Sequence, residues 1–97
     1  ENDLTSKDKD KFVSNVKISP NPLNSKGLLT FDLKENAETT VRIFNLTGAL
    51  VKTMNLGMKT KGENNETFNA SDLSVGTYIL SLESNGQRNV AKFIVTR

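Results

Sequence analysis

Few side chains in this sequence are of the types that perform chemistry. The 97 residues contain no His, no Cys and no Trp. Imidazole bases, thiolate nucleophiles, disulfides and His or Cys metal sites are therefore excluded from this chain. Carboxylate pairs remain, Asp32 with Glu35 and Glu63 with Glu66, in which one member could act as acid and the other as base. Both pairs lie in polar stretches without apolar surroundings that would shift a pKa, so we expect no enzyme activity and no cofactor.

Two other motif types have simpler explanations than a site. Residues 8–10 read Asp-Lys-Asp, but the segment lacks the Gly and the distal Glu of a calcium loop, so no metal site is expected. Asn45, Asn65 and Asn69 each begin an Asn-x-Ser/Thr triplet. Such triplets arise by chance in an Asn-rich chain, and we do not interpret them as glycosylation sites.

The charge balance and the apolar pattern exclude further classes of partner. Lys and Arg number 13 and Asp and Glu number 11, which gives a formal net charge of +2. This balance is too even to predict binding to nucleic acid or to an anionic membrane. No apolar run approaches the ~20 residues that span a bilayer, so no direct membrane insertion is expected.

The first residues differ from the rest of the chain. Within residues 1–11 acidic and basic side chains alternate, and Leu4 is the one bulky apolar residue. Such a stretch cannot bury enough surface to offset its ordering entropy. The start has no basic or apolar region of a signal peptide and reads as a cut inside a longer protein. We predict a flexible linker over residues 1–15 and one folded domain over residues 16–97.

From residue 16 onward the dominant period of apolar residues is two, which is the period of a half-buried strand. Turn residues recur at intervals of about ten, and Asn85-Gly86 is the strongest hairpin signal. We expect Val51 and Thr53 to face the core, Ser81 to face outward, and residues 56–62 to form a loop. The predicted strands are residues 16–19, 29–33, 39–44, 50–55, 65–70, 77–84 and 88–95.

This pattern is typical of an all-β, seven-stranded, antiparallel sandwich of immunoglobulin-like type. No segment sustains a helical period of 3.6. The core is expected to consist of the apolar residues on the inward face of each strand. They are Val16, Ile18, Leu29, Phe31, Leu33, Val41, Ile43, Val51, Phe68, Leu73, Tyr78, Leu80, Leu82, Phe93 and Val95.

Four local patterns follow one another in a fixed order. They are Ile-Ser-Pro-Asn-Pro at 18–22, Val-Arg-Ile-Phe-Asn-Leu-Thr-Gly at 41–48, a segment from Phe68 to Leu80 containing Gly-Thr-Tyr, and Lys-Phe-Ile-Val at 92–95. In this order and spacing they resemble the C-terminal sorting domain of proteins exported by the type IX (Por) secretion system of Bacteroidota, in its type A form. The resemblance covers residues 16–97 and leaves only the linker outside.

The resemblance implies a function as a secretion signal. In that family, the domain directs an upstream cargo across the outer membrane through a translocon and its shuttle proteins, after transit through the periplasm. A surface sortase then cuts near the start of the domain, and the cargo ends at the cell surface or in the medium. Here the cut is expected in residues 1–15, before Val16, because proteases need an accessible backbone.

Most of the shared motif residues have a structural explanation. Prolines fix φ and remove N–H donors, which ends the first strand, and glycines allow tight reversals. An aromatic ring with a hydroxyl can pack inside and bond a backbone carbonyl at the rim. The residues interpreted as mainly structural are Pro20, Asn21, Pro22, Gly48, Leu73, Gly76, Tyr78, Phe93 and Val95.

The last strand is the candidate recognition element. In an immunoglobulin-like sandwich the final strand usually lies at a sheet edge, where a partner can add a strand to its unpaired backbone. We expect the translocon to read residues 88–97 by backbone pairing and by charge. Alternatively, the strand closes the fold and its cations only protect the edge. The proposed recognition residues are Arg88, Val90, Lys92, Ile94 and Arg97.

Two other functions fit the sequence. One is a carbohydrate-binding or adhesive sandwich attached to an enzyme, which would need exposed aromatic side chains. With one Tyr, five Phe and no Trp, the plausible exposed rings are Phe12 and Phe44. The other is a passive spacer in a multidomain protein.

Overall fold

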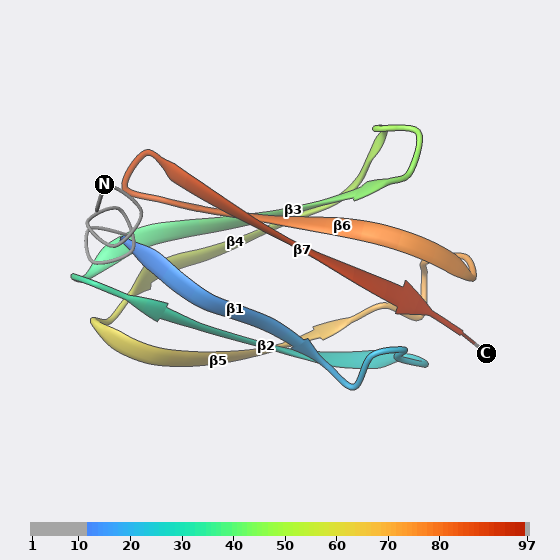
Figure 1. Cartoon of the computed structure of the whole chain (residues 1–97), viewed down its shortest axis with the longest axis horizontal. Coiled ribbons are helices and arrows are strands. Elements are labelled where there is room, and N and C mark those ends of the chain that lie inside the picture. The colour runs from blue at the N-terminus through green and yellow to red at the C-terminus, as the bar shows by residue number, and fades with distance from the viewer. Residues whose placement is uncertain (1–11, 97) are drawn as a thin grey trace, which may run out of the picture.

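The computed structural model describes residues 12–96, which form two packed β-sheets (Figure 1). This confirms the all-β, seven-stranded, antiparallel sandwich expected from the sequence. Among the residues that the structure describes, no helix is long and apolar enough to cross a membrane. The strands are β1 (Val13–Ser19), β2 (Lys26–Leu33), β3 (Ala37–Asn45), β4 (Leu50–Lys59), β5 (Gly62–Asn69), β6 (Gly76–Ser84) and β7 (Gln87–Val95).

The order of the strands places β7 at an edge. The smaller sheet has the order β1-β2-β5 and the larger sheet the order β4-β3-β6-β7. Every ladder within the two sheets is antiparallel. In Figure 1, β7 runs beside β1 of the other sheet in the same direction, and the two strands contact each other.

The core lies between the two sheets and is filled by the inward residues of each strand, as alternation predicts. Phe93 is completely buried in this core. Its ring stacks on Tyr78 with centroids 5.7 Å apart and meets the edge of Phe68 at 5.9 Å. Each fully buried large side chain contributes roughly 1.5–3 kcal/mol of transfer free energy. The buried apolar residues are Phe12, Val13, Ile18, Leu23, Leu29, Phe31, Leu33, Val41, Ile43, Phe68, Ala70, Leu73, Tyr78, Leu80, Leu82, Phe93 and Val95.

The side chains of β4 that face the core are not the expected ones. Val51 is 40% exposed, whereas Met54 and Leu56 pack against the core. The cause is a bulge: Ile43 pairs with Lys52 but Phe44 pairs with Leu50, so residue 51 has no partner. One extra residue exchanges the two faces of a strand. The prediction that Val51 and Thr53 face the core was therefore wrong.

The loop expected at residues 56–62 is also wrong. β4 continues to Lys59, and β5 begins at Gly62. Gly57 has a φ of 77° and lies at a second irregularity of the ladder, between Thr39 and Thr40 of β3. Glycine takes this left-handed conformation without a Cβ clash, so the ladder absorbs an extra residue and continues.

The folded part begins earlier than residue 16. β1 starts at Val13, and Phe12 and Val13 are both buried. A bulge between Ser14 and Lys17, with Asn15 at a φ of 56°, allows Val13 and Ile18 to face the same core although their spacing is odd. Residues 12–15 of the expected linker are thus part of the sandwich, and residues 1–11 lie outside the described range.

Candidate functional site: the edge of β7

β7 exposes one row of side chains and buries the other. Phe93 and Val95 face the core, whereas Arg88, Val90, Lys92 and Ile94 face outward and are exposed. The structure thus brings these four of the proposed recognition residues to one face of an edge strand. The fifth, Arg97, lies outside the described residues.

The backbone of the same four residues points away from the sheet. In an antiparallel ladder, alternate residues direct both their N–H and their C=O to the neighbouring strand, and the others direct both outward. The Ile94 N–H and C=O both bond to residues outside the ladder with β6. By alternation, the outward set also contains Lys92, Val90 and Arg88.

Part of this outward edge is already covered by the chain itself. The Asn21 side chain accepts a hydrogen bond from the Ile94 N–H at 3.0 Å and donates one to the Lys92 carbonyl at 3.4 Å. The Leu23 N–H donates to the Ile94 carbonyl at 2.9 Å, and the Thr96 N–H donates to the Leu23 carbonyl at 2.8 Å. We call residues 21–23 the capping segment.

The sequence explains why residues 21–23 can pair with the outward backbone edge of β7. Pro20 and Pro22 have no N–H, so the chain cannot continue as a paired strand. The Asn21 amide carries a donor and an acceptor side by side, as a peptide group does, and can replace one in a ladder. Leu23 is completely buried and anchors the segment. Sequence reasoning placed Pro20, Asn21 and Pro22 in the scaffold, and missed both Leu23 and the contact with β7.

The edge of β7 is therefore divided in two. In its C-terminal half, Lys92 C=O, both backbone groups of Ile94 and Thr96 N–H have partners. In its N-terminal half, the outward backbone groups of Arg88 and Val90 and the Lys92 N–H have none among the described residues. A strand from a partner can pair with this N-terminal half without displacing the capping segment.

The cations of the edge are also unpaired within the described range. The ion pairs there are Arg42 with Glu83 at 2.7 Å, Lys52 with Asp72 at 3.1 Å, and Lys59 with Glu66. Arg88 and Lys92 belong to none of them.

The hydrogen bond from Lys52 holds the pKa of the Asp72 carboxyl below its usual value of 3.8.

The remaining motif residues support the fold around β7. Tyr78 lies opposite Phe93 in the ladder, and its hydroxyl donates to the Ser74 carbonyl at 2.6 Å. Gly48 has a φ of 91° in the β3–β4 turn. Leu73 is buried, and Gly76 begins β6.

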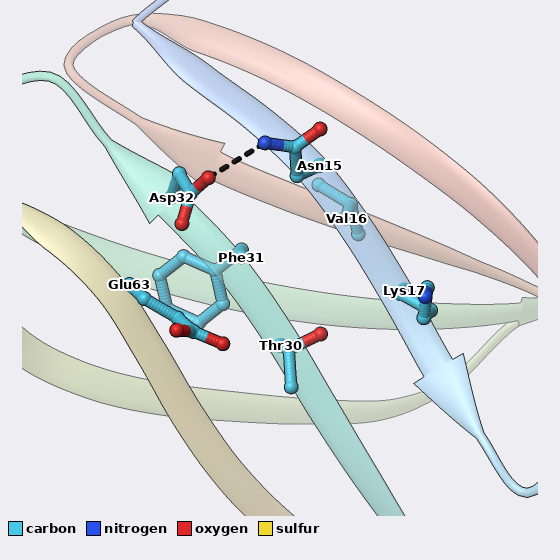
Figure 2. A pocket seen from close by; sticks show the side chains of 7 residues that line it. All are labelled: Asn15, Val16, Lys17, Thr30, Phe31, Asp32 and Glu63. Carbon is cyan, nitrogen blue, oxygen red and sulfur yellow. Dashed lines mark hydrogen bonds between the residues drawn. The ribbon is translucent and has the colours of Figure 1, made fainter.

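A hollow lies at the bulge of β1 (Figure 2). Asn15 donates to the Asp32 carboxylate at 2.6 Å, and Asp32 lies opposite Glu63 in the ladder. Within residues 12–96, no group of three or more His, Cys, Asp or Glu is arranged to hold a metal. The candidate pair Glu63 and Glu66 faces opposite sides of β5, since its members are an odd number apart, and Glu66 is bound to Lys59.

The two rings considered for sugar binding do not form a platform. Phe12 is buried in the core, which corrects its expected exposure, and Phe44 is half-buried on β3. Carbohydrate sites that rely on stacking need exposed ring faces. Residues 12–96 provide no such pair of exposed ring faces.

The family model described as "Secretion system C-terminal sorting domain" matches residues 17–96. The chain belongs to this family. The match includes both the capping segment and β7. This type IX secretion sorting domain thus belongs to a non-catalytic signal family, associated with export to the cell surface or beyond. No curated protein matches the sequence.

Solved structures show the same fold as this sorting domain. One is PorZ, an essential bacterial surface component of the type-IX secretion system of Porphyromonas gingivalis, with a TM-score of 0.57 and 22% identity. The match covers 86% of this chain but only 12% of PorZ. Another is the CARDB domain of a Pyrococcus furiosus protein in complex with di-metal ions, with a TM-score of 0.54, 21% identity and 89% of each chain covered. At these identities the likeness concerns the fold alone.

Proposed function

We propose that this domain is the export signal of a cargo upstream in the same polypeptide. The type IX translocon and its shuttle proteins take the cargo from the periplasm across the outer membrane after recognising β7. The family match over residues 17–96 is the observation that carries this proposal. The edge position of β7 and its unpaired N-terminal half support β7 as the recognised element.

Recognition has a backbone part and a charge part. The translocon adds a strand to the outward backbone of Arg88–Lys92, because these groups need partners and extended peptides supply them. Arg88 and Lys92 attract acidic groups of the receptor and set the approach of the two surfaces. Ile94 contributes its apolar side chain, since its backbone is occupied by the capping segment.

After export, a surface sortase separates the cargo from the domain. Because Phe12 and Val13 are buried, we place the cut before Phe12 rather than at the expected position before Val16. N-terminal sequencing of the released domain tests this position. A first residue after Phe12 would contradict it.

The export role is tested by fusion to a reporter. Residues 1–97 are attached to a periplasm-targeted reporter in a bacterium with a working type IX system, and reporter in the medium and at the surface is measured. We expect export with the domain and periplasmic retention without it. Retention of the intact fusion would overturn the export role.

A finer variant tests the edge. Val90→Pro removes the outward Val90 N–H and leaves the ladder with β6 intact, because proline is accepted at the solvent side of edge strands. Val90→Ala is the matched control, since it shortens the side chain and keeps the N–H. We expect Val90→Pro to fold, as shown by its thermal unfolding, and to be retained, while Val90→Ala is exported. Normal export of a folded Val90→Pro fusion would refute strand addition but not the export role.

A further inference from the structure

A pocket of about 290 Å³ lies on the outer face of the larger sheet, away from the sandwich core. Its floor is Ser81 on the central strand β6. Apolar side chains of three strands and a turn form its wall, and one cation stands beside it. These surrounding residues are Phe44, Leu46, Ile79, Val90 and Arg88.

Local packing explains why the surface is hollow at this position. In the ladders, Ser81 lies opposite Arg42 of β3 on one side and Val90 of β7 on the other. Serine is much smaller than both neighbours. The Arg42 guanidinium is drawn away to Glu83, with which it forms a 2.7 Å hydrogen bond. The surface around Ser81 is therefore hollowed, although neighbouring side chains still cover its hydroxyl.

The floor of the pocket carries an unsatisfied polar atom. Ser81 is 2% exposed, and its Oγ has no hydrogen-bond partner among the described residues. Buried hydroxyl groups in folded proteins nearly always have partners, because an unpaired one lowers stability. The neighbouring buried serine of β6, Ser84, follows this rule and bonds both Thr39 Oγ1 and the Glu38 carbonyl. Ser81 is the exception: its hydroxyl lies beneath the side chains that line the pocket and has no partner among the described residues.

The wall of the pocket is unusually exposed for apolar residues. Leu46 is 66% exposed and Val90 is 59% exposed. Contiguous apolar surface of this kind marks interaction sites in soluble proteins. Arg88 at the rim has no ion pair or hydrogen bond within the described range. The pocket thus combines an apolar wall, a free cation and an unpaired hydroxyl.

We propose that this pocket binds an apolar side chain of a partner protein, from a segment that carries an acidic residue next to it. The apolar side chain lies against Phe44, Ile79 and Val90, and the acidic residue pairs with Arg88. The side chains that cover Ser81 move aside on binding, so that a polar group of the segment bonds its hydroxyl. This surface shares Arg88 and Val90 with the proposed recognition strand, but it uses their side chains on the outer face of the sheet and not the backbone edge of β7. The proposal therefore holds whether or not a translocon strand pairs with that edge.

The size of the pocket favours a protein segment over an anionic amphiphile or a sugar. A volume of about 290 Å³ is at the lower end of ligand sites and suits one or two side chains. A single arginine provides one charged anchor, whereas anionic lipid surfaces are bound by clusters of basic residues. The one buried hydroxyl of the pocket, that of Ser81, needs one directed hydrogen bond, which a polar group of a protein segment can supply.

The test uses the chain of residues 1–97 labelled with ¹⁵N and blocked dipeptides as probes. The primary probe is N-acetyl-phenylalanyl-aspartyl amide, and the controls are the phenylalanyl-lysyl and alanyl-aspartyl analogues. We expect saturable amide shifts confined to residues around Ser81, with clearly weaker binding of both control probes. Equal binding of the aspartyl and lysyl probes, or shifts centred on the smaller sheet, would overturn the proposal.

Variants assign the effect to the pocket. Arg88→Gln should weaken the aspartyl probe about two- to five-fold, the range of an exposed charge pair, and leave the lysyl probe unchanged. Lys26→Gln, which removes an exposed cation from β2, is the matched control and should change neither. Ser81→Ala should weaken binding about two- to ten-fold, the range of one net hydrogen bond. Unchanged binding in both pocket variants would refute the assignment.

A vesicle experiment separates a lipid surface from a protein segment. Vesicles of anionic phosphatidylglycerol are added in place of the dipeptides. We expect no shifts at Ile79 and Ser81, because a headgroup surface cannot enter a pocket of this size. If these residues respond to vesicles and not to the aspartyl probe, the proposal is wrong and the surface binds membrane.

Discussion

The two halves of the β7 edge face the same solvent but differ in how their backbone is satisfied. The outward backbone of the C-terminal half is paired with Asn21 and Leu23. In the N-terminal half, side chains of Gln87 and Asn89 bond the backbone of Phe12 and Val13, but the outward backbone groups have no partner among the described residues. Edge strands invite unwanted pairing, and proteins commonly cover them. Here the chain covers one half with a segment from the other end of the domain and leaves the other half open beside a pocket. Under the proposed function, this difference favours recognition at residues 88–92 over recognition along the whole strand.

Removing the anchor of the capping segment should have the largest effect. Leu23 is completely buried and holds residues 21–23 against β7. Leu23→Ala is expected to lower the free energy of unfolding by about 2–5 kcal/mol, because it leaves a cavity. Urea unfolding measures this change. The control Leu46→Ala, at a residue 66% exposed, should lie within about 0.5 kcal/mol of the parent protein. Similar values for the two variants would show that the covered half is not anchored by Leu23.

The two buried serines of β6 should respond in opposite ways. Ser84→Ala removes a paired hydroxyl and should cost about 1 kcal/mol of stability. Ser81→Ala removes an unpaired one and should be neutral or stabilising by up to about 1 kcal/mol. Thermal unfolding of the two variants measures both stability changes. A loss at Ser81 as large as that at Ser84 would mean that the open half has no unsatisfied group beneath its pocket.

Removing the Asn21 amide should make the two halves of the β7 edge more alike in the exposure of their outward backbone groups. Asn21→Ala removes the two side-chain bonds to Ile94 N–H and Lys92 C=O, and we expect a loss of about 0.5–1 kcal/mol because the site is exposed. Amide hydrogen exchange at Ile94 should accelerate toward that of Val90. Asn65→Ala, an exposed substitution on β5, is the control and should leave exchange at Ile94 unchanged. An unchanged hydrogen-exchange rate at Ile94 in Asn21→Ala would contradict the claim that the Asn21 side chain protects the Ile94 N–H.

The smallest effect is expected at the ion pair of Lys52 and Asp72, which belongs to neither half. The hydrogen bond from Lys52 lowers the pKa of Asp72 below 3.8, so the contact stabilises the fold above that pH and is lost as pH falls through the lowered pKa. Asp72→Asn should unfold with a slightly flatter pH dependence below pH 4 than the parent, and match its slope above pH 5. Chemical unfolding across this range measures it. A difference confined to neutral pH would contradict the assignment.

The capping segment shows where sequence reasoning succeeded and where it failed. The prolines at 20 and 22 correctly predicted the end of the first strand, because a missing N–H acts locally. Nothing local indicates that the Asn21 side chain bonds Ile94, a residue 73 positions away. A useful signal was nevertheless present: an Asn between two prolines has few neighbouring N–H groups to bond, which favours a distant partner.

The sequence by itself determined the fold class, the seven strands and most of the core, because alternation with a period of two follows from the backbone geometry of each strand. Only the tertiary structure decided the facing of Val51, the burial of Phe12 and Leu23, and the unpaired Ser81 hydroxyl. These depend on bulges and on contacts between distant strands. A bulge shifts the register by one residue without changing composition, and a pocket exists only where neighbouring strands place large and small side chains together.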